Sequence, residues 1–209
     1  IPIYADGFLP LIESQIVDIS AAAGIRGDLG AWNYDLSLVY GSNRLDYGVS
    51  NSVNTSLGGA SSLRKFNAGG LRSGQTSLNL DVQRELDIGI GKSVSFAFGG
   101  EWRNENYKIV PGEEQSWING PFSAAPYGAA GGSQVFPGFR PSNATDVSRD
   151  SFAGYVELDS DITDSFTLQL AGRYEHFSDF GDTVNGKAAA RFEPISGLAF
   201  RGSISTGFR

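Results

Sequence analysis

The feature that most constrains this chain is an alternation of apolar and polar residues that recurs along most of its length. In the stretch LAFRGSISTGFR (198–209), one set of alternate positions is mostly apolar, while the other is polar or small. Successive side chains of a β-strand point to opposite faces, so a period of two predicts strands with one apolar face. Helical periodicity is hard to find, and the pattern therefore predicts an all-β chain.

The alternation divides the chain into an antiparallel up-and-down meander of about eight strands. Short turns are expected near residues 28–30, 86–92, 163–164 and 194–197, and longer connections over 48–73 and 110–149, with a modest one at 179–182. Short turns at one end of a sheet and long loops at the other are typical of an outer-membrane β-barrel. The predicted strands cover 17–27, 31–47, 74–86, 93–109, 150–162, 165–178, 183–193 and 198–209.

The two predicted faces differ in the way that a barrel wall requires. One carries most of the charges, which suits either solvent or a water-filled lumen. The other carries Leu, Val, Ala and Gly, with almost no charge, and a charge there would cost roughly 2–4 kcal/mol at mid-depth of a bilayer. Aromatic residues lie near its strand ends, as in the girdles of a membrane barrel: Trp32, Tyr40, Trp102, Tyr174, Phe192 and Phe208.

Composition excludes several other classes of protein. The net charge of −7 leaves no basic stripe for a nucleic-acid partner. With no cysteine, the chain can form neither disulfides nor a thiolate metal site. Its first residues, IPIYADGFLP, lack the basic start and apolar core expected of a signal peptide, and no apolar run approaches the ~20 residues that a transmembrane helix needs.

Several segments resemble the barrel of TonB-dependent outer-membrane receptors. The C-terminal stretch contains the S-D-F-G motif of that family (Ser178–Gly181), a strand with Lys187 and Arg191, a P-x-x-x-L turn (194–198) and an R-x-S-x-S-x-G-F-R strand (201–209). Further similar segments are WNYDLSLVYGSN (32–43), NSVNTSLGG (51–59), FAFGGEWRNENYKIVPGE (96–113) and QVFPGFRPSNATDVSRDSFAGYVELD (134–159).

The resemblance implies a non-enzymatic segment, without its plug domain, of a roughly 22-stranded transmembrane β-barrel. It implies the bacterial outer membrane as location, and as partners membrane lipid, the plug, TonB and a small-molecule nutrient such as an iron–siderophore, cobalamin or an oligosaccharide. Open strand edges would let the isolated segment self-associate. The alternatives are a complete small barrel with a structural or adhesion role, in which the first and last strands pair, and an outer-membrane hydrolase.

Two groups of residues are candidates for ligand contact. The long connection 110–149 is expected to contact a ligand through aromatic rings and one cation, or to be a flexible loop without such a role: Trp117, Phe122, Tyr127, Phe136, Phe139 and Arg140. The polar face is expected to line the lumen, where its charges contact a substrate or the plug, or simply form a ladder of paired charges: Glu157, Arg173, Glu175, Lys187, Arg191 and Arg201.

The sequence assigns no catalytic residue, cofactor or metal site. His176 is the only histidine and is expected at a strand end, without a nucleophile beside it. One alternative is left open for the outer loops, in which carboxylates gather around a calcium ion: Glu113, Glu114, Asp146 and Asp150.

Overall fold

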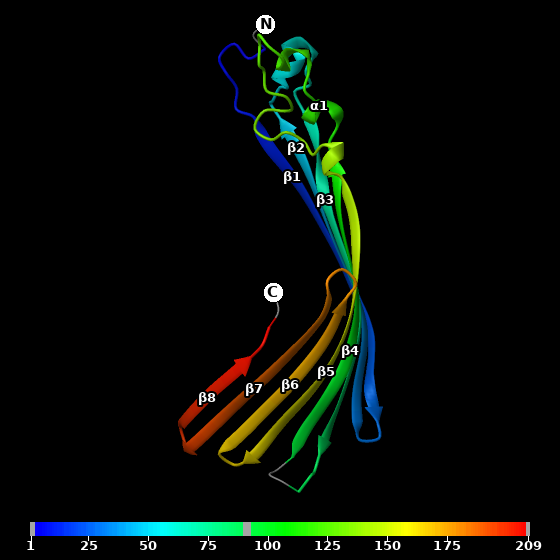
Figure 1. Ribbon diagram of the computed structural model, residues 1–209, viewed down its shortest axis with the longest axis vertical. Helices are drawn as coiled ribbons and strands as arrows, with labels where there is room; N and C mark the ends of the chain where they lie inside the picture. The colour runs from blue at the N-terminus through cyan, green and yellow to red at the C-terminus, as the bar shows by residue number, and fades with distance from the viewer. Residues whose placement is uncertain (1–2, 90–92, 208–209) are drawn as a thin grey trace. The chain divides into compact units, whose positions relative to one another are not determined.

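The computed structural model describes residues 3–89 and 93–207. Within them lies one sheet of eight strands whose order follows the sequence, β1 to β8 (Figure 1). This confirms the predicted all-β antiparallel meander. The strands are β1 (Leu11–Leu29), β2 (Trp32–Ser50), β3 (Phe66–Leu86), β4 (Val94–Pro111), β5 (Thr145–Thr163), β6 (Phe166–Phe177), β7 (Gly181–Ile195) and β8 (Leu198–Ser205).

Helical structure is confined to short turns in the connections. Across the described ranges, no helix has both the length and the apolar run needed to cross a membrane. The short elements are α1 (Glu114–Trp117) and four 3₁₀ turns, η1 (Thr55–Leu57), η2 (Gly59–Ser61), η3 (Pro121–Ser123) and η4 (Pro141–Asn143).

Strands β1 to β5 are longer than the sequence predicts, and the long connections are correspondingly shorter. The predicted connection 48–73 shrinks to 51–65, because β3 already begins at Phe66. Its first residues, FNAGGLRSG, are rich in glycine, which disguises a strand. Close packing explains two of these glycines: a Cβ on Gly69 would meet the Gly112 nitrogen at 2.7 Å, and one on Gly70 would meet Asp46 at 2.8 Å. The connection predicted over 110–149 covers 112–144, and β8 ends at Ser205.

The chain forms two compact units, and strands β1 to β5 each contribute to both. Unit 1 comprises residues 1–20, 41–74 and 105–148, and unit 2 comprises 21–40, 75–104 and 149–209. The longer connections 51–65 and 112–144 belong to unit 1, whereas the links between β1 and β2, β3 and β4, β5 and β6, and β7 and β8 belong to unit 2. Short and long connections therefore alternate as predicted from β1 to β6, whereas the modest connection predicted at 179–182 has only three residues, 178–180, and is as short as the turns.

The pairing of β5 to β8 fixes which side chains share a face in unit 2. Leu158 pairs with Leu170, Leu170 with Ala188, and Ala188 with Ile204. These four residues form one row across the sheet. The neighbouring row places charged Glu157 opposite Ala171, and Ala171 opposite Lys187.

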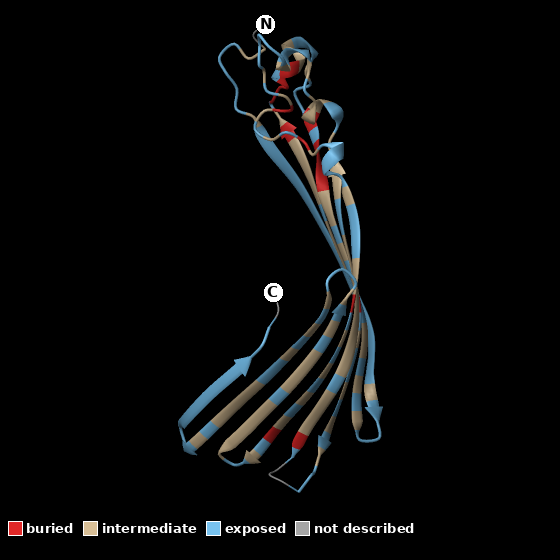
Figure 2. Cartoon of the chain, viewed as in Figure 1, coloured by how far each residue is buried: buried red, intermediate tan, exposed pale blue. Residues whose placement is uncertain are grey.

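Unit 1 holds a small hydrophobic core of its own. Val49, Phe66 and Ala68 are at most 1% exposed, and Tyr47 and Phe136 pack against them. Figure 2 shows buried residues gathered where the connections of this unit meet the ends of β2 and β3, while intermediate and exposed residues dominate the strands of unit 2. The connections of unit 1 are thus packed onto its strands.

Candidate functional site

One face of unit 2 is apolar and open. Val156, Leu158, Leu170, Val184 and Ile204 are each 41–77% exposed, although they are large hydrophobic residues. A water-soluble protein rarely exposes a continuous patch of this kind. Its chemistry suits hydrocarbon.

Aromatic residues border this apolar face at two levels. Phe166 pairs with Phe192, and Phe192 with Phe200, in one row beside the β5–β6 and β7–β8 turns. Tyr174 lies eight residues further along β6, on the same face by alternation. At a rise of about 3.3 Å per residue and a tilt near 40°, eight residues span roughly 20 Å of depth. The separation agrees with the ~25 Å apolar band of outer-membrane barrels.

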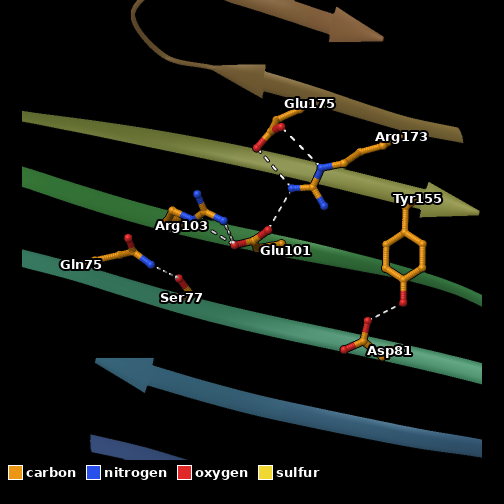
Figure 3. Close-up of polar contacts among 8 residues, drawn as sticks. All are labelled: Gln75, Ser77, Asp81, Glu101, Arg103, Tyr155, Arg173 and Glu175. Atoms are coloured by element: carbon orange, nitrogen blue, oxygen red, sulfur yellow. Dashed lines mark hydrogen bonds and ion pairs between the residues drawn. The ribbon is translucent and has the colours of Figure 1, made fainter. Parts of the chain in front are cut away.

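The opposite face of unit 2 carries a charge ladder, a set of four contacting side chains of alternating charge: Arg103, Glu101, Arg173 and Glu175 (Figure 3). Glu101 on β4 accepts hydrogen bonds from Arg103 at 2.5 Å and from Arg173 on β6 at 2.9 Å. Arg173 also contacts Glu175 at 3.2 Å. The sign of the charge alternates through these four side chains, so side chains that contact one another in the charge ladder attract and do not repel.

A glycine gives a tyrosine on the same face room to cross a strand. Tyr155 on β5 donates a hydrogen bond to Asp81 on β3. A Cβ on Gly99 of β4 would lie 2.5 Å from the Tyr155 ring. Gly99 therefore supplies the space through which Tyr155 makes the contact with Asp81 that Figure 3 shows.

The six residues predicted to line a lumen share this polar face. Glu157 and Lys187 are joined through Gln169, which donates to Glu157 at 2.7 Å and accepts from Lys187 at 2.8 Å. Arg191 contacts Glu193 and lies opposite Arg201 in the register of β7 and β8. Glu157, Arg173 and Lys187 thus have contacts to a neighbouring strand or beyond, whereas Glu175 and Arg191 have partners in their own strands.

The six residues predicted to contact a ligand divide into two kinds. Phe136 and Phe139 pack with Tyr47 at ring-centroid distances of 5.2 and 6.1 Å, and so belong to the wall of the core. Phe122 and Tyr127 are 38% and 68% exposed and meet edge to face at 5.1 Å. The remaining two differ from both pairs: the Trp117 indole donates to the Gly112 carbonyl at 3.1 Å, and Arg140 is exposed.

The connection 112–144 is a folded cap that buried polar residues hold in place. Asn54, fully buried, donates to the carbonyls of Gln115 at 2.9 Å and Ile118 at 3.0 Å. The Ser116 carbonyl accepts from the backbone of Ser133 and Gly138 at 3.0 and 2.9 Å. Such contacts give no periodic signal, and only the run of Ser, Asn and Gly in these segments marks them in the sequence.

Charged contacts also join segments of unit 1 that lie far along the strands from the short turns. A transmembrane strand needs about 9–11 residues, and Lys108 and Asp146 lie further than that from the turn ends of β4 and β5. Lys108 contacts Asp146 at 2.8 Å, and hydrogen bonds from Lys108 and Asn106 lower the pKa of Asp146. Likewise, a hydrogen bond from Ser50 and the charge of Lys65 lower the pKa of Glu13.

The calcium alternative was wrong. No three His, Cys, Asp or Glu residues among those the structure describes lie close enough to share a metal ion. Three of the four carboxylates contact other groups instead. Glu113 accepts from the backbone N–H of Asn67 at 2.7 Å, Asp146 pairs with Lys108, and Asp150 accepts from the Trp102 indole at 3.2 Å.

Two more predictions concern His176 and the two edge strands of the sheet. His176 lies at the end of β6, as expected, and its Nδ1 contacts Asp182 at 2.6 Å. Strands β1 and β8 are at opposite ends of the sheet order. They do not pair within the described segments, which contradicts the alternative of a small closed barrel. The girdle prediction for Phe208 lies outside the described residues.

Comparison with known proteins agrees with this geometry. A search of curated proteins found no match. The protein-family model described as "TonB dependent receptor-like, beta-barrel" matches residues 12–209, which is nearly the whole chain. The two-faced sheet, its aromatic rows and this match together show that the chain belongs to the β-barrel family of TonB-dependent receptors, a transport family of the bacterial outer membrane.

Proposed function

We propose that this chain is part of the wall and outer ligand-contact surface of a receptor that takes up a scarce nutrient without chemical conversion. The observation that carries the proposal is the two-faced sheet of unit 2, apolar on one side and a charge ladder on the other. A wall of this kind separates lipid from a polar passage. The parent barrel would have roughly 22 strands and a plug, and TonB would supply the energy for passage.

The outer contact surface would be the cap formed by residues 112–144. Because buried hydrogen bonds hold the cap, its exposed ring pair Phe122 and Tyr127 stays in one arrangement before a ligand arrives. Preorganised aromatic rings supply apolar contact at a small entropy cost. Arg140 adds a cation that could pair with an anionic nutrient, while Phe136 and Phe139 would support the cap from beneath.

The polar face would be the passage wall, with charges paired both within and across strands. The four side chains of the charge ladder are only 14–34% exposed. They therefore make the face polar without presenting an unpaired charge that would bind a cargo too tightly. Iron–siderophore complexes, cobalamin and oligosaccharides all fit a wall of this kind.

The test uses cells that express the full-length protein carrying this chain. Uptake of each candidate nutrient is compared with and without TonB, and then for Phe122→Ala with Tyr127→Ala. We expect TonB-dependent uptake of one nutrient class and a KM for uptake raised several-fold in the double variant. Val135→Ala is the matched control, since Val135 is a 55% exposed residue of the same cap outside the ring pair. Uptake of no candidate, or uptake independent of TonB, would contradict the proposal.

A further inference from the structure

One cation interrupts the apolar face of unit 2. Along β3, Leu78, Leu80 and Val82 occupy alternate positions, and Arg84 is the next in that series. Leu78 and Leu80 are 42% and 43% exposed on the apolar face. Asp81 belongs to the other set and contacts Tyr155 on the polar face. Arg84 is therefore a charged residue on the face that meets lipid.

Aromatic rings surround the Arg84 side chain. Its guanidinium carbon lies 5.4 Å from the ring centroid of Trp32. Trp32 in turn meets Phe96 at 6.2 Å and Phe98 at 5.8 Å, both edge to face. A cation held over an indole ring is fixed in orientation. This cluster of Trp32, Arg84, Phe96 and Phe98 is named the girdle cluster below.

The guanidinium of Arg84 has an N–H donor without a hydrogen-bond acceptor. The Arg84 Nε is buried and has no hydrogen-bond partner. Within residues 3–89 and 93–207, Arg84 forms no ion pair with any carboxylate. A buried charged donor without an acceptor is destabilising, so such groups normally have a partner. Arg84 as a residue is only partly buried, so an acceptor from outside the described chain can reach its side chain.

The depth of Arg84 indicates what that partner is. Arg84 lies two residues before the end of β3 at Leu86, or about 5 Å of depth from the turn. A charge at this level of a lipid-facing strand costs little, whereas one at mid-depth costs far more. The long side chain also lets the guanidinium reach the headgroup layer. The acceptors at that level are the phosphate oxygens of phospholipids.

We propose that the girdle cluster is a binding site for the phosphate of a membrane phospholipid in the leaflet nearest the short turns. Arg84 donates to the phosphate oxygens in the two-pronged geometry that guanidinium favours. Trp32 holds the guanidinium and Phe98, 37% exposed, contacts the upper part of an acyl chain. The inference rests on the membrane placement of the sheet but not on the identity of the nutrient.

Native mass spectrometry of the full-length protein tests the site. The delipidated protein is titrated with dioleoyl phosphatidylglycerol, and with dioleoylglycerol, which has the same tails but no phosphate. We expect Arg84→Gln to weaken binding of the first phosphatidylglycerol about tenfold and to leave dioleoylglycerol binding unchanged. Arg26→Gln is the matched control, because Arg26 lies three residues from the turn end of β1 and lines a cavity with Asp81 and Tyr155 of the polar face.

Three results would overturn the proposal. The first is equal phosphatidylglycerol binding by the wild type and Arg84→Gln. The second is an equal loss in Arg26→Gln. The third is displacement of the lipid by excess inorganic phosphate, which would indicate a site for free anions. Should Arg84→Gln not fold, Arg84→Lys keeps the charge without the planar fork, and we expect a loss of about threefold; unchanged binding would refute the site.

The lipid titration is independent of transport. It requires no nutrient and no TonB, so failure of every uptake assay would leave its result standing. Conversely, uptake per folded receptor is expected to be unchanged in Arg84→Gln, since Arg84 touches neither the cap nor the charge ladder. The two proposals can therefore fail separately.

Discussion

Replacing Leu170 by arginine would test the orientation of the sheet most directly. Leu170 lies four residues into β6, is 42% exposed, and belongs to the row of Leu158, Ala188 and Ile204. Four residues correspond to about 10 Å of depth, close to the middle of a ~25 Å apolar band. A charge at that depth of a lipid-facing strand costs roughly 2–4 kcal/mol. The equilibrium ratio of folded to unfolded protein should therefore fall by a factor of roughly 30 to 700.

The adjacent residue supplies a matched control. Ala171 points to the opposite face and is in register with Glu157 and Lys187. An arginine there would meet water and a carboxylate, so Ala171→Arg should cost less than about 1 kcal/mol. The two variants add the same side chain, one residue apart. Only the face differs between them.

Reversible unfolding of the full-length protein in lipid vesicles, followed by tryptophan fluorescence across a urea series, measures both free energies. The expected result is a large loss of stability for Leu170→Arg and a small one for Ala171→Arg. Equal losses, or the larger loss in Ala171→Arg, would mean that the Leu170 row does not face lipid. The assignment of the lumen face would then also be lost.

Two further predictions concern unit 1. Asn54→Ala removes both hydrogen bonds that hold the cap at Gln115 and Ile118, so hydrogen exchange over residues 112–144 should accelerate by an amount equivalent to about 2–3 kcal/mol, whereas an unchanged exchange rate would show that the cap is held elsewhere. The lowered pKa of Asp146 means that its pairing with Lys108 stabilises the fold above the unfolded-state pKa, 3.8, and that this contribution is lost as pH falls through the lower folded value. Protection factors of amides near Asp146, which correct for the intrinsic pH dependence of exchange, should therefore fall on acidification more in the wild type than in Asp146→Asn, and identical pH profiles would contradict the pairing.

The sequence was sufficient to predict all eight strands and their two faces, because alternation is a local property. Leu168, Leu170 and Tyr174 differ from Thr167, Gln169 and Arg173 whatever the sheet pairs with, and the register of β5 to β7 confirms that division. Which side chains of the polar face contact one another was harder to predict. That Tyr155 reaches Asp81 depends on the space above Gly99, which only the aligned strands reveal.

The outer parts of the strands and the cap were harder to predict because their stability comes from non-local contacts. The start of β3 contains glycines that suit close backbone packing and carry no alternation. The cap depends on buried Asn54, Ser116 and Ser133, residue types that usually mark loops. Its six candidate ligand residues looked alike in sequence, and packing separates Phe136 and Phe139 from exposed Phe122 and Tyr127.

The distribution of burial follows from the solvent that each unit is built to meet. Four of the five buried hydrophobic residues in the described ranges, Val49, Val53, Phe66 and Ala68, belong to unit 1, and only Val94 belongs to unit 2. Lipid can cover an apolar face from outside, so unit 2 requires no core and leaves its leucines and valines exposed. Strand segments beyond the bilayer lack that cover and must bury apolar groups among themselves. The cap over residues 112–144 therefore has a structural reason to be folded that is independent of the proposed ligand contact.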